Sequence, residues 1–528
     1  MGAALTTNQY KPQNNALRSQ AGPVNFATPA EKLMRIWLNE CVAHHAPCRM
    51  TEDNPPLPRR VVDVGSSDPL KPPFLHISDG QHDKYATLSY CWGSLPILPK
   101  TTSDTILERM SGIRIEDLPA TIRDSILLTR TLGIRYLWID SLCILQDSPT
   151  DWEIESASMA SVYRLSTVTI VANTARNVYE GCAPCRNKLV LAPCAVLGDD
   201  VAIHLQSQGR HVPYDKPIDQ RGWAFQESQL SPRLLHCDGE QISWQCLYSD
   251  LTEADPVGSS HRTTPRNMQV KWQIRPRDQE ERRALVTRTS TFQYWYDLVQ
   301  VYSERTLTFA DDKLPGIAGL ADHFRRSLSS QSSDSDLNYL SGLWREDLLW
   351  GLMWRNIGNS TSHIYRSPSW SWTTLDAGVL HEDMGSDVLP LKPCAEVLDA
   401  SVVVRGLNPF GKVTSGKVTL YGPLAPLPPA VFEEETYKDQ PGTYTKKRSR
   451  WMFPIVQWDR QIAPSIDSVC LRTFSECGLI LTPVKKPFAP GIYTRVGYIK
   501  STENLRRRQT EPNLLDGLEW QPALVTII

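Results

Sequence analysis

Carboxylate, hydroxyl and thiol side chains follow two apolar stretches of the sequence, where buried strands would end. The two groups are Ser89, Tyr90, Cys91 and Trp92 after the first stretch, and Asp140, Ser141, Cys143, Gln146 and Asp147 after the second. Asp140 and Asp147 could supply paired carboxylates for acid–base chemistry. Asp147 is better placed to cap a helix that begins near Asp151. Asp140, which ends an otherwise apolar run, is therefore the stronger candidate for a catalytic residue.

The cysteines offer a second kind of chemistry. Cys41, His45 and Cys48 have the spacing Cys-x3-His-x2-Cys, and Cys182 and Cys185 form a separate Cys-x2-Cys pair. Together these residues have enough soft ligands for tetrahedral zinc, but the sequence does not bring the two groups together. Cys91 or Cys143 could also act as a thiolate with His236 as its base, although buried thiols are usually inert. We therefore expect thiols that pack in the core, and we assign no metal.

The elements that must position these side chains alternate between strand and helix. We expect strands at Arg60 to Val64, Tyr85 to Trp92, Tyr136 to Asp140 and Thr167 to Ala172. Helices are expected from Leu118 to about Gly133 and from Asp151 to Leu165. This order is typical of an α/β fold with a parallel sheet, in which ligands bind outside the carboxyl ends of the strands. That edge would collect the two groups above, with Asn173 from the next strand, and is the predicted site.

Composition and the spacing of apolar residues divide the chain into five regions. We expect a disordered tail at 1–27, an α/β domain at 28–255 that closes with a hairpin around Asp238 and Gly239, and a linker or excursion at 256–284. Apolar residues at helical spacing predict a helical region at 285–365, and alternation with a period of two predicts a β-rich region at 366–528.

Composition excludes several classes of protein. The 528 residues carry 56 basic and 58 acidic side chains, a formal net charge of -2, so no overall field attracts nucleic acid. No apolar run approaches the roughly 20 residues of a membrane helix. Twelve scattered cysteines without a signal peptide indicate reduced thiols. We expect a cytoplasmic or nuclear protein with no nucleic-acid partner and no membrane span.

Three motifs resemble the fungal heterokaryon incompatibility (HET domain) family. They are Tyr85-Ala-Thr-Leu-Ser-Tyr-Cys-Trp-Gly93, Leu137-Trp-Ile-Asp-Ser-Leu-Cys-Ile-Leu-Gln146 and Arg221-Gly-Trp-Ala-Phe-Gln-Glu227. Further segments resemble the C-terminal extension of that family: Arg305-Thr-Leu-Thr308, Asp312-Lys-Leu-Pro315, Leu343-Trp-Arg345 and Pro368-Ser-Trp-Ser-Trp372. The resemblance implies a role in fungal nonself recognition and programmed cell death, with a protein partner in the signalling system.

The resemblance also suggests a reaction. The HET domain is distantly similar to the TIR fold, whose enzymatic members cleave NAD with a glutamate in a Trp-Cys-x-x-Glu segment. Trp223 and Glu227 have the same spacing here. A carboxylate can stabilise the oxocarbenium charge that develops on the ribose, and a tryptophan, Trp223 or Trp92, can stack on a ring. Glu227 is therefore a candidate catalytic residue and NAD a candidate substrate, unless Glu227 only caps a helix or pairs with Arg221 or Arg233.

Two other functions remain open. The protein could be a non-enzymatic signalling module that binds a partner protein through tryptophan-rich surfaces. It could also be an enzyme of a specialised-metabolite pathway, because HET-like proteins can be encoded beside biosynthetic genes.

Overall fold

The structure of the chain is a computed structural model, and it describes most of the sequence. The described ranges are 28–49, 53–65, 71–93, 99–182, 194–197, 202–205, 216–239, 241–258, 288–329, 337–358, 365–381, 391–427, 434–436, 447–449, 455–459, 467–484, 490–500 and 517–528, with residues 465 and 515. The tail predicted at 1–27 and nearly all of the linker predicted at 256–284 lie outside these ranges.

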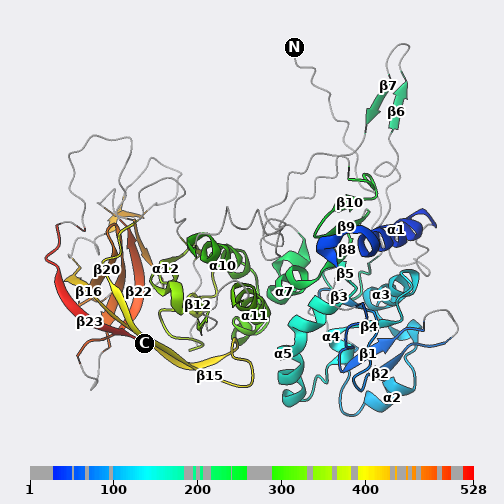
Figure 1. Cartoon of the computed structure of the whole chain (residues 1–528), viewed down its shortest axis with the longest axis horizontal. Coiled ribbons are helices and arrows are strands. Elements are labelled where there is room, and N and C mark those ends of the chain that lie inside the picture. Colours follow the sequence, from blue (N-terminus) through cyan, green and yellow to red (C-terminus); the bar gives the residue numbers. More distant parts are fainter. Residues whose placement is uncertain are drawn as a thin grey trace.

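An eight-stranded sheet forms the centre of the N-terminal part, in the order β10-β9-β8-β5-β3-β4-β1-β2 (Figure 1). Its strands are β1 (Arg60–Asp63), β2 (Phe74–Ile77), β3 (Tyr85–Ser89), β4 (Tyr136–Trp138), β5 (Val168–Ala172), β8 (Arg233–Cys237), β9 (Ile242–Cys246) and β10 (Asp250–Thr252). The predicted α/β class is confirmed, and each strand expected in this region is present.

The sheet is mixed, and in this respect the prediction of a parallel sheet was wrong. Strands β4, β3, β5 and β8 are parallel neighbours, whereas β1 and β2 at one edge and β9 and β10 at the other are antiparallel. The central strands β3, β4 and β5 are buried along their whole length, which their continuous apolar sequences permit. Short connections join β8 to β9 and β9 to β10, and connections of this length can join only antiparallel strands.

Helices cover both faces of this sheet. They are α1 (Thr28–His44), α2 (Ile106–Ser111), α3 (Ala120–Thr131), α4 (Asp140–Cys143), α5 (Pro149–Leu165) and α7 (Gly222–Leu230), with short 3-10 turns at Ala46–Cys48, Ile115–Asp117 and Pro217–Gln220. Helix α5 begins where Ser148 accepts a hydrogen bond from the amide of Asp151, with Pro149 in the first turn. A two-stranded ribbon, β6 (Cys194–Leu197) with β7 (Ala202–Leu205), is also present.

A layer of helices and short strand pairs, called the helical layer below, follows in the middle of the chain. Its helices are α10 (Arg288–Ser303), α11 (Pro315–Ser329) and α12 (Leu348–Gly351), with 3-10 turns at Ala310–Asp312, Arg345–Asp347 and Trp372–Thr374. It also contains two pairs of short antiparallel strands. They are β11 (Tyr339–Leu340) with β12 (Leu343–Trp344), and β13 (Trp354–Asn356) with β14 (Val379–His381). Tryptophans that the sequence places at apolar spacing, including Trp295, Trp344, Trp354, Trp370 and Trp372, are fully buried here.

The C-terminal part is a seven-stranded sheet, which confirms the predicted β-rich end. Its strands are β15 (Glu396–Val404), β16 (Val413–Pro426), β19 (Ile455–Trp458), β20 (Val469–Phe474), β21 (Cys477–Pro483), β22 (Ile492–Lys500) and β23 (Gln521–Ile527); β17 (Glu434–Thr436) and β18 (Lys447–Ser449) form a separate ribbon.

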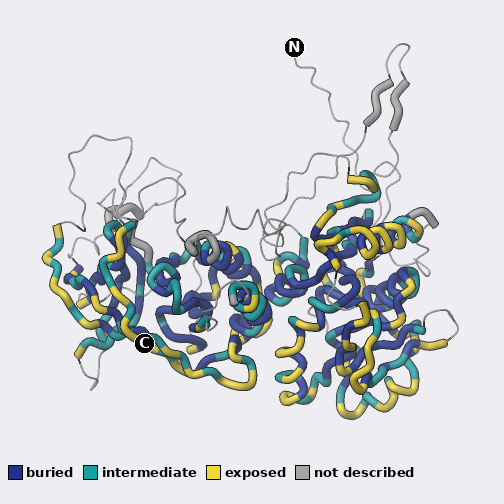
Figure 2. Tube along the Cα trace, in the orientation of Figure 1, coloured by how far each residue is buried: buried dark blue, intermediate teal, exposed yellow. Residues whose placement is uncertain are grey.

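The helical layer lies directly against the N-terminal part. Helix α11 contacts both α5 and α7 (Figure 1). The amide of Gly319 donates to Gln226 Oε1 at 2.7 Å, and a Cβ at Gly319 would lie 2.3 Å from Ala160 Cβ. Figure 2 shows the buried centre of each part beneath an exposed outer layer. No helix in the described ranges is long and apolar enough to cross a membrane.

Candidate functional site

The predicted edge of the sheet is formed by the ends of the parallel strands. Strand β3 ends at Ser89, β4 leads through Ile139 to Asp140, and β5 leads to Asn173. Because neighbouring parallel strands end on the same side, the side chains that follow them lie near one another.

Glu227 reaches this edge from helix α7. The Ser89 hydroxyl donates a hydrogen bond to Glu227 Oε2, and the glutamate is only 4% exposed. The motif around Glu227 and the motif around Ser89 therefore meet at one point, although they lie far apart in the sequence.

The environment of Glu227 favours its neutral form. Burial raises the pKa of its carboxyl to about 7, although Arg221 and the hydrogen bond from Ser89 act in the opposite direction. Asp140 contributes in the same direction as burial, because two negative charges repel one another. A carboxyl with a pKa near neutrality can both accept and release a proton at physiological pH.

Asp140 belongs to the same site, because its charge acts on the Glu227 carboxyl. Trp92 Nε1 donates to Asp140 Oδ2 at 2.9 Å, and the amide of Ser141 donates to Asp140 Oδ1 at 2.7 Å. Tyr90 donates to the Ser141 hydroxyl at 2.9 Å, and Gln146 Nε2 donates to the backbone oxygen of Asp140 at 3.1 Å. The pKa of the Asp140 carboxyl is also raised, because the effect of burial exceeds the opposing effect of the Arg221 charge.

The positive charge of Arg221 acts on both carboxyl groups. It stabilises the charged forms of Glu227 and Asp140, and its guanidinium donates to the backbone oxygen of Tyr90. Sequence reasoning considered Arg221 only as a partner that would make Glu227 structural. Its position at the start of the motif that ends in Glu227 was the signal that could have placed it in the site.

The two cysteines among the predicted site residues lie in apolar surroundings. Cys91 packs with Val171, Ile218, Ala224 and Leu234. Cys143 is fully buried, and its sulfur accepts a hydrogen bond from the amide of Ile139. Burial raises the pKa of both thiols, that of Cys143 to about 12, which opposes the formation of a thiolate.

Trp223 lies one helical turn before Glu227 and faces a different part of the chain. Its Nε1 donates to Asp312 Oδ2 at 3.2 Å, so the indole joins helix α7 to the helical layer. The indole of Trp92, in contrast, donates a hydrogen bond to Asp140.

A second polar cluster lies along the same edge, at the ends of β5 and β8. Asn173 hydrogen-bonds both His236 and Asp238, and Lys216 forms an ion pair with Asp238. Burial would raise the pKa of Asp238, but Lys216 and His236 lower it to about 2. This carboxylate therefore stays charged, in contrast with Glu227.

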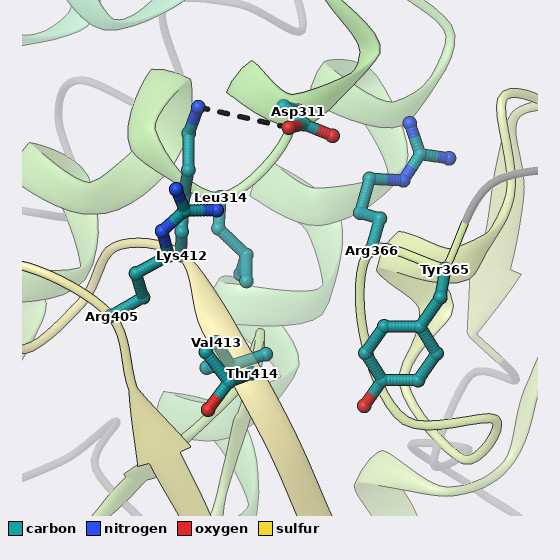
Figure 3. A pocket seen from close by; sticks show the side chains of 8 residues that line it. All are labelled: Asp311, Leu314, Tyr365, Arg366, Arg405, Lys412, Val413 and Thr414. Carbon is teal, nitrogen blue, oxygen red and sulfur yellow. Dashed lines mark ion pairs between the residues drawn. The ribbon is translucent and has the colours of Figure 1, made fainter.

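A pocket of about 220 Å³ lies elsewhere, between the helical layer and the start of the C-terminal sheet (Figure 3). The residues that line it include Asp311, Arg366, Arg405 and Lys412. Lys412 Nζ lies 4.0 Å from Asp311 Oδ2. None of the predicted site residues lines this pocket.

The thiols near the N-terminus come together in a way that the sequence did not predict. Cys41, His45 and Cys48 lie beside Cys246, with one potential ligand atom from each within 4.8 Å of all the others. Cys182, which the sequence offered as a further soft ligand, lies against Thr121 and Asp124, and Cys185 is outside the described ranges.

Comparison with known proteins identifies the segment that carries the carboxyl site. No curated protein and no solved structure matches the chain. The family model described as Heterokaryon incompatibility protein (HET) matches residues 85–227, from the first residue of β3 to Glu227 itself. The chain therefore carries a heterokaryon incompatibility (HET) domain.

Proposed function

We propose that the HET domain cleaves the bond between nicotinamide and ribose in NAD, and that the protein acts in fungal nonself recognition and cell death through this reaction. The observation that carries the proposal is the buried Glu227 carboxyl at the edge of the sheet, hydrogen-bonded by Ser89 and raised in pKa to about 7.

The chemistry of the cleavage matches this carboxyl. As the C–N bond breaks, its electron pair leaves with nicotinamide, and positive charge develops on the ribose. The Glu227 carboxylate stabilises that charge. A water molecule then attacks the same carbon and passes a proton to Glu227, which releases it to solvent. The products are nicotinamide, ADP-ribose and one proton.

The surrounding residues fit the parts of such a substrate. Asp140 and Trp92 are half-buried, whereas Glu227 is buried. Lys100 lies with its Nζ 5.4 Å from the centre of the Trp92 ring and is exposed, so a cation is available for a diphosphate. In the proposed complex Trp92 stacks on a ring of the substrate, and Asp140 accepts hydrogen bonds from ribose hydroxyls.

Nicotinamide release from NAD by the purified full-length protein tests the proposal. Glu227→Gln keeps the size of the side chain and should abolish release. Glu155→Gln is the matched control, because Glu155 is also a buried acid with a raised pKa, but it lies on α5 in an ion pair with Arg60. Release by the parent and the control, but not by Glu227→Gln, supports the proposal.

Two results would overturn it. Well-folded parent protein that releases no nicotinamide would leave the partner-binding module or the biosynthetic enzyme as the explanation. Equal activity of parent and Glu227→Gln would place the catalytic group elsewhere.

A further inference from the structure

Three cysteines and one histidine converge where the N-terminal helix meets the edge of the sheet. Cys41 lies in the last turn of α1, His45 follows it, Cys48 ends the next 3-10 turn, and Cys246 ends β9. All three cysteines are at most 1% exposed, whereas His45 is half-buried. Two distant parts of the sequence thus contribute to one compact cluster.

The separations suit a tetrahedral ion. One potential ligand atom of each residue lies within 4.8 Å of every other. In a zinc site with Zn–S of about 2.3 Å and Zn–N of about 2.0 Å, ligand atoms are roughly 3.5–3.8 Å apart. His45 Nδ1 and Cys246 Sγ are 3.4 Å apart, close to the edge of such a tetrahedron.

A buried arginine, Arg233, lies against the cluster. Arg233 is 2% exposed and lies opposite Cys246 in the β8–β9 register. Its guanidinium donates to Cys41 Sγ at 3.2 Å, to the oxygen of Cys48 at 2.7 Å and to the oxygen of Thr167 at 3.2 Å. No carboxylate of the described residues forms an ion pair with it. A buried cation without an anion is costly.

One zinc ion with three thiolates and one neutral imidazole carries a net charge of -1. This charge would cancel the positive charge of the Arg233 guanidinium, so that the zinc centre and Arg233 together would be neutral. Three neutral thiols around the same guanidinium would leave its charge uncompensated.

The turn after β9 is shaped to hold a negatively charged sulfur. The backbone amides of Tyr248 and Ser249 both donate to Cys246 Sγ, at 3.4 and 3.2 Å. The Tyr248 ring lies against His45, with the ring centres 4.4 Å apart. Hydrogen bonds to ligand atoms and packing around ligand rings are the outer contacts that orient the ligands of a metal site.

We propose that Cys41, His45, Cys48 and Cys246 bind one structural Zn²⁺ ion. Four protein ligands close the coordination shell and leave no position for substrate, so the site fastens α1 to the β8–β9 hairpin rather than catalysing a reaction. The ligands lie on both sides of the segment that matches the HET family model, which includes none of them.

Metal analysis of the full-length protein, produced in zinc-containing medium and purified without chelator, tests this inference. We expect about one zinc per chain, lost in Cys246→Ser. His45→Ala removes a half-buried ligand, so it should stay folded while its zinc is lost to a competing chelator more easily than that of the parent. Cys470→Ser is the control, because it removes an equally buried thiol from the C-terminal sheet and should keep the zinc.

Cobalt gives a second measurement that reports the ligands themselves. Co²⁺ added to the metal-free protein should produce the visible absorption of tetrahedral thiolate coordination in the parent and Cys470→Ser, and a weakened or shifted spectrum in His45→Ala. The proposal is overturned if folded parent protein contains no zinc and binds no Co²⁺, if Cys246→Ser retains as much zinc as the parent, or if mass spectrometry finds these cysteines joined as a disulfide.

Discussion

Ser89 donates a hydrogen bond to Glu227, joining the end of strand β3 to helix α7 across 138 positions of sequence. This bond favours the charged form of the glutamate against the effect of burial. Ser89→Ala should therefore raise the pKa of Glu227 above its value of about 7, by roughly one unit if the bond contributes about 1.5 kcal/mol.

The measurement is the pH profile of nicotinamide release, whose acidic limb should move to higher pH in Ser89→Ala. Thr87→Ala removes a buried hydroxyl of the same strand that bonds Thr169, so its profile should not move. An unchanged profile in Ser89→Ala would show that Glu227 does not control the reaction.

The pKa of Glu227 also predicts how its removal changes stability. The folded pKa, about 7, lies above the ordinary value of 4.5, so the folded state binds more protons between these two values. The favourable contribution of the protonated carboxyl is complete below pH 4.5 and is lost as the pH rises through 7. Glu227→Gln should consequently be more stable than the parent by about 1–3 kcal/mol above pH 7 and similar to it in acid. Urea unfolding across this range measures the difference, and a gain independent of pH would contradict the prediction.

Gly93 ends the motif that carries Trp92, and it has both a left-handed backbone and no free space. Its φ is +82°, and an added Cβ would lie 2.4 Å from Asn177 Cβ and 3.2 Å from Asn177 Cα. Gly93→Ala should cost about 2–4 kcal/mol of unfolding free energy, because strain and overlap both contribute.

Gly80 provides the comparison for Gly93. Its φ is +80°, with no atom within 4 Å of the added Cβ. Gly80→Ala should cost only the backbone strain, about 1–2 kcal/mol. Equal losses in thermal or urea unfolding would contradict the role assigned to Asn177.

Arg60 connects strand β1 with the end of helix α4 and with helix α5. Its guanidinium pairs with Asp151 and Glu155 and donates to the oxygen of Cys143 at 2.6 Å. Arg60→Met would leave two buried carboxylates without this partner and should cost about 3–5 kcal/mol.

The neighbouring Arg59 is a matched control for Arg60. Its guanidinium also forms an ion pair with Asp151, with 3.1 Å between Arg59 Nη1 and Asp151 Oδ1, but the Arg59 side chain is 58% exposed. Because exposed ion pairs contribute little, Arg59→Met should cost at most about 1 kcal/mol. Similar losses in the two variants, measured by urea unfolding, would refute the difference in burial as the cause.

The sequence was sufficient for the elements whose patterns are local. The apolar runs that became β3, β4 and β5 and the turn at Asp238 and Gly239 depend on neighbouring residues, and the structure confirms them. The prediction that Asp147 caps α5 was wrong: Ser148 caps that helix, and the Asp147 carboxylate accepts hydrogen bonds from the amide of Ser103 instead. The position of Asp140 and Ser89 at the carboxyl edge followed from strand order alone.

What the sequence could not supply was pairing between distant segments. Strand β2 was missed, because Phe74 to Ile77 is short and its place beside β1 depends on a long-range register. Cys246 was not connected with Cys41 and Cys48 for the same reason: its approach depends on β9 reaching the last turn of α1. Arg221 was recognised as a charge, but its action on two carboxyl groups required their positions in space.

The segment that matches the HET family contains only three of the eight strands in its sheet, β3, β4 and β5. A fragment cut to residues 85–227 would therefore present two bare strand edges, those that β1 and β8 cover in the whole protein. Exposed edges of apolar parallel strands recruit further strands from other molecules, so such a fragment should aggregate. A useful recombinant fragment has to begin before α1 and continue through α11, since the helix that carries Glu227 packs on both the sheet and that later helix.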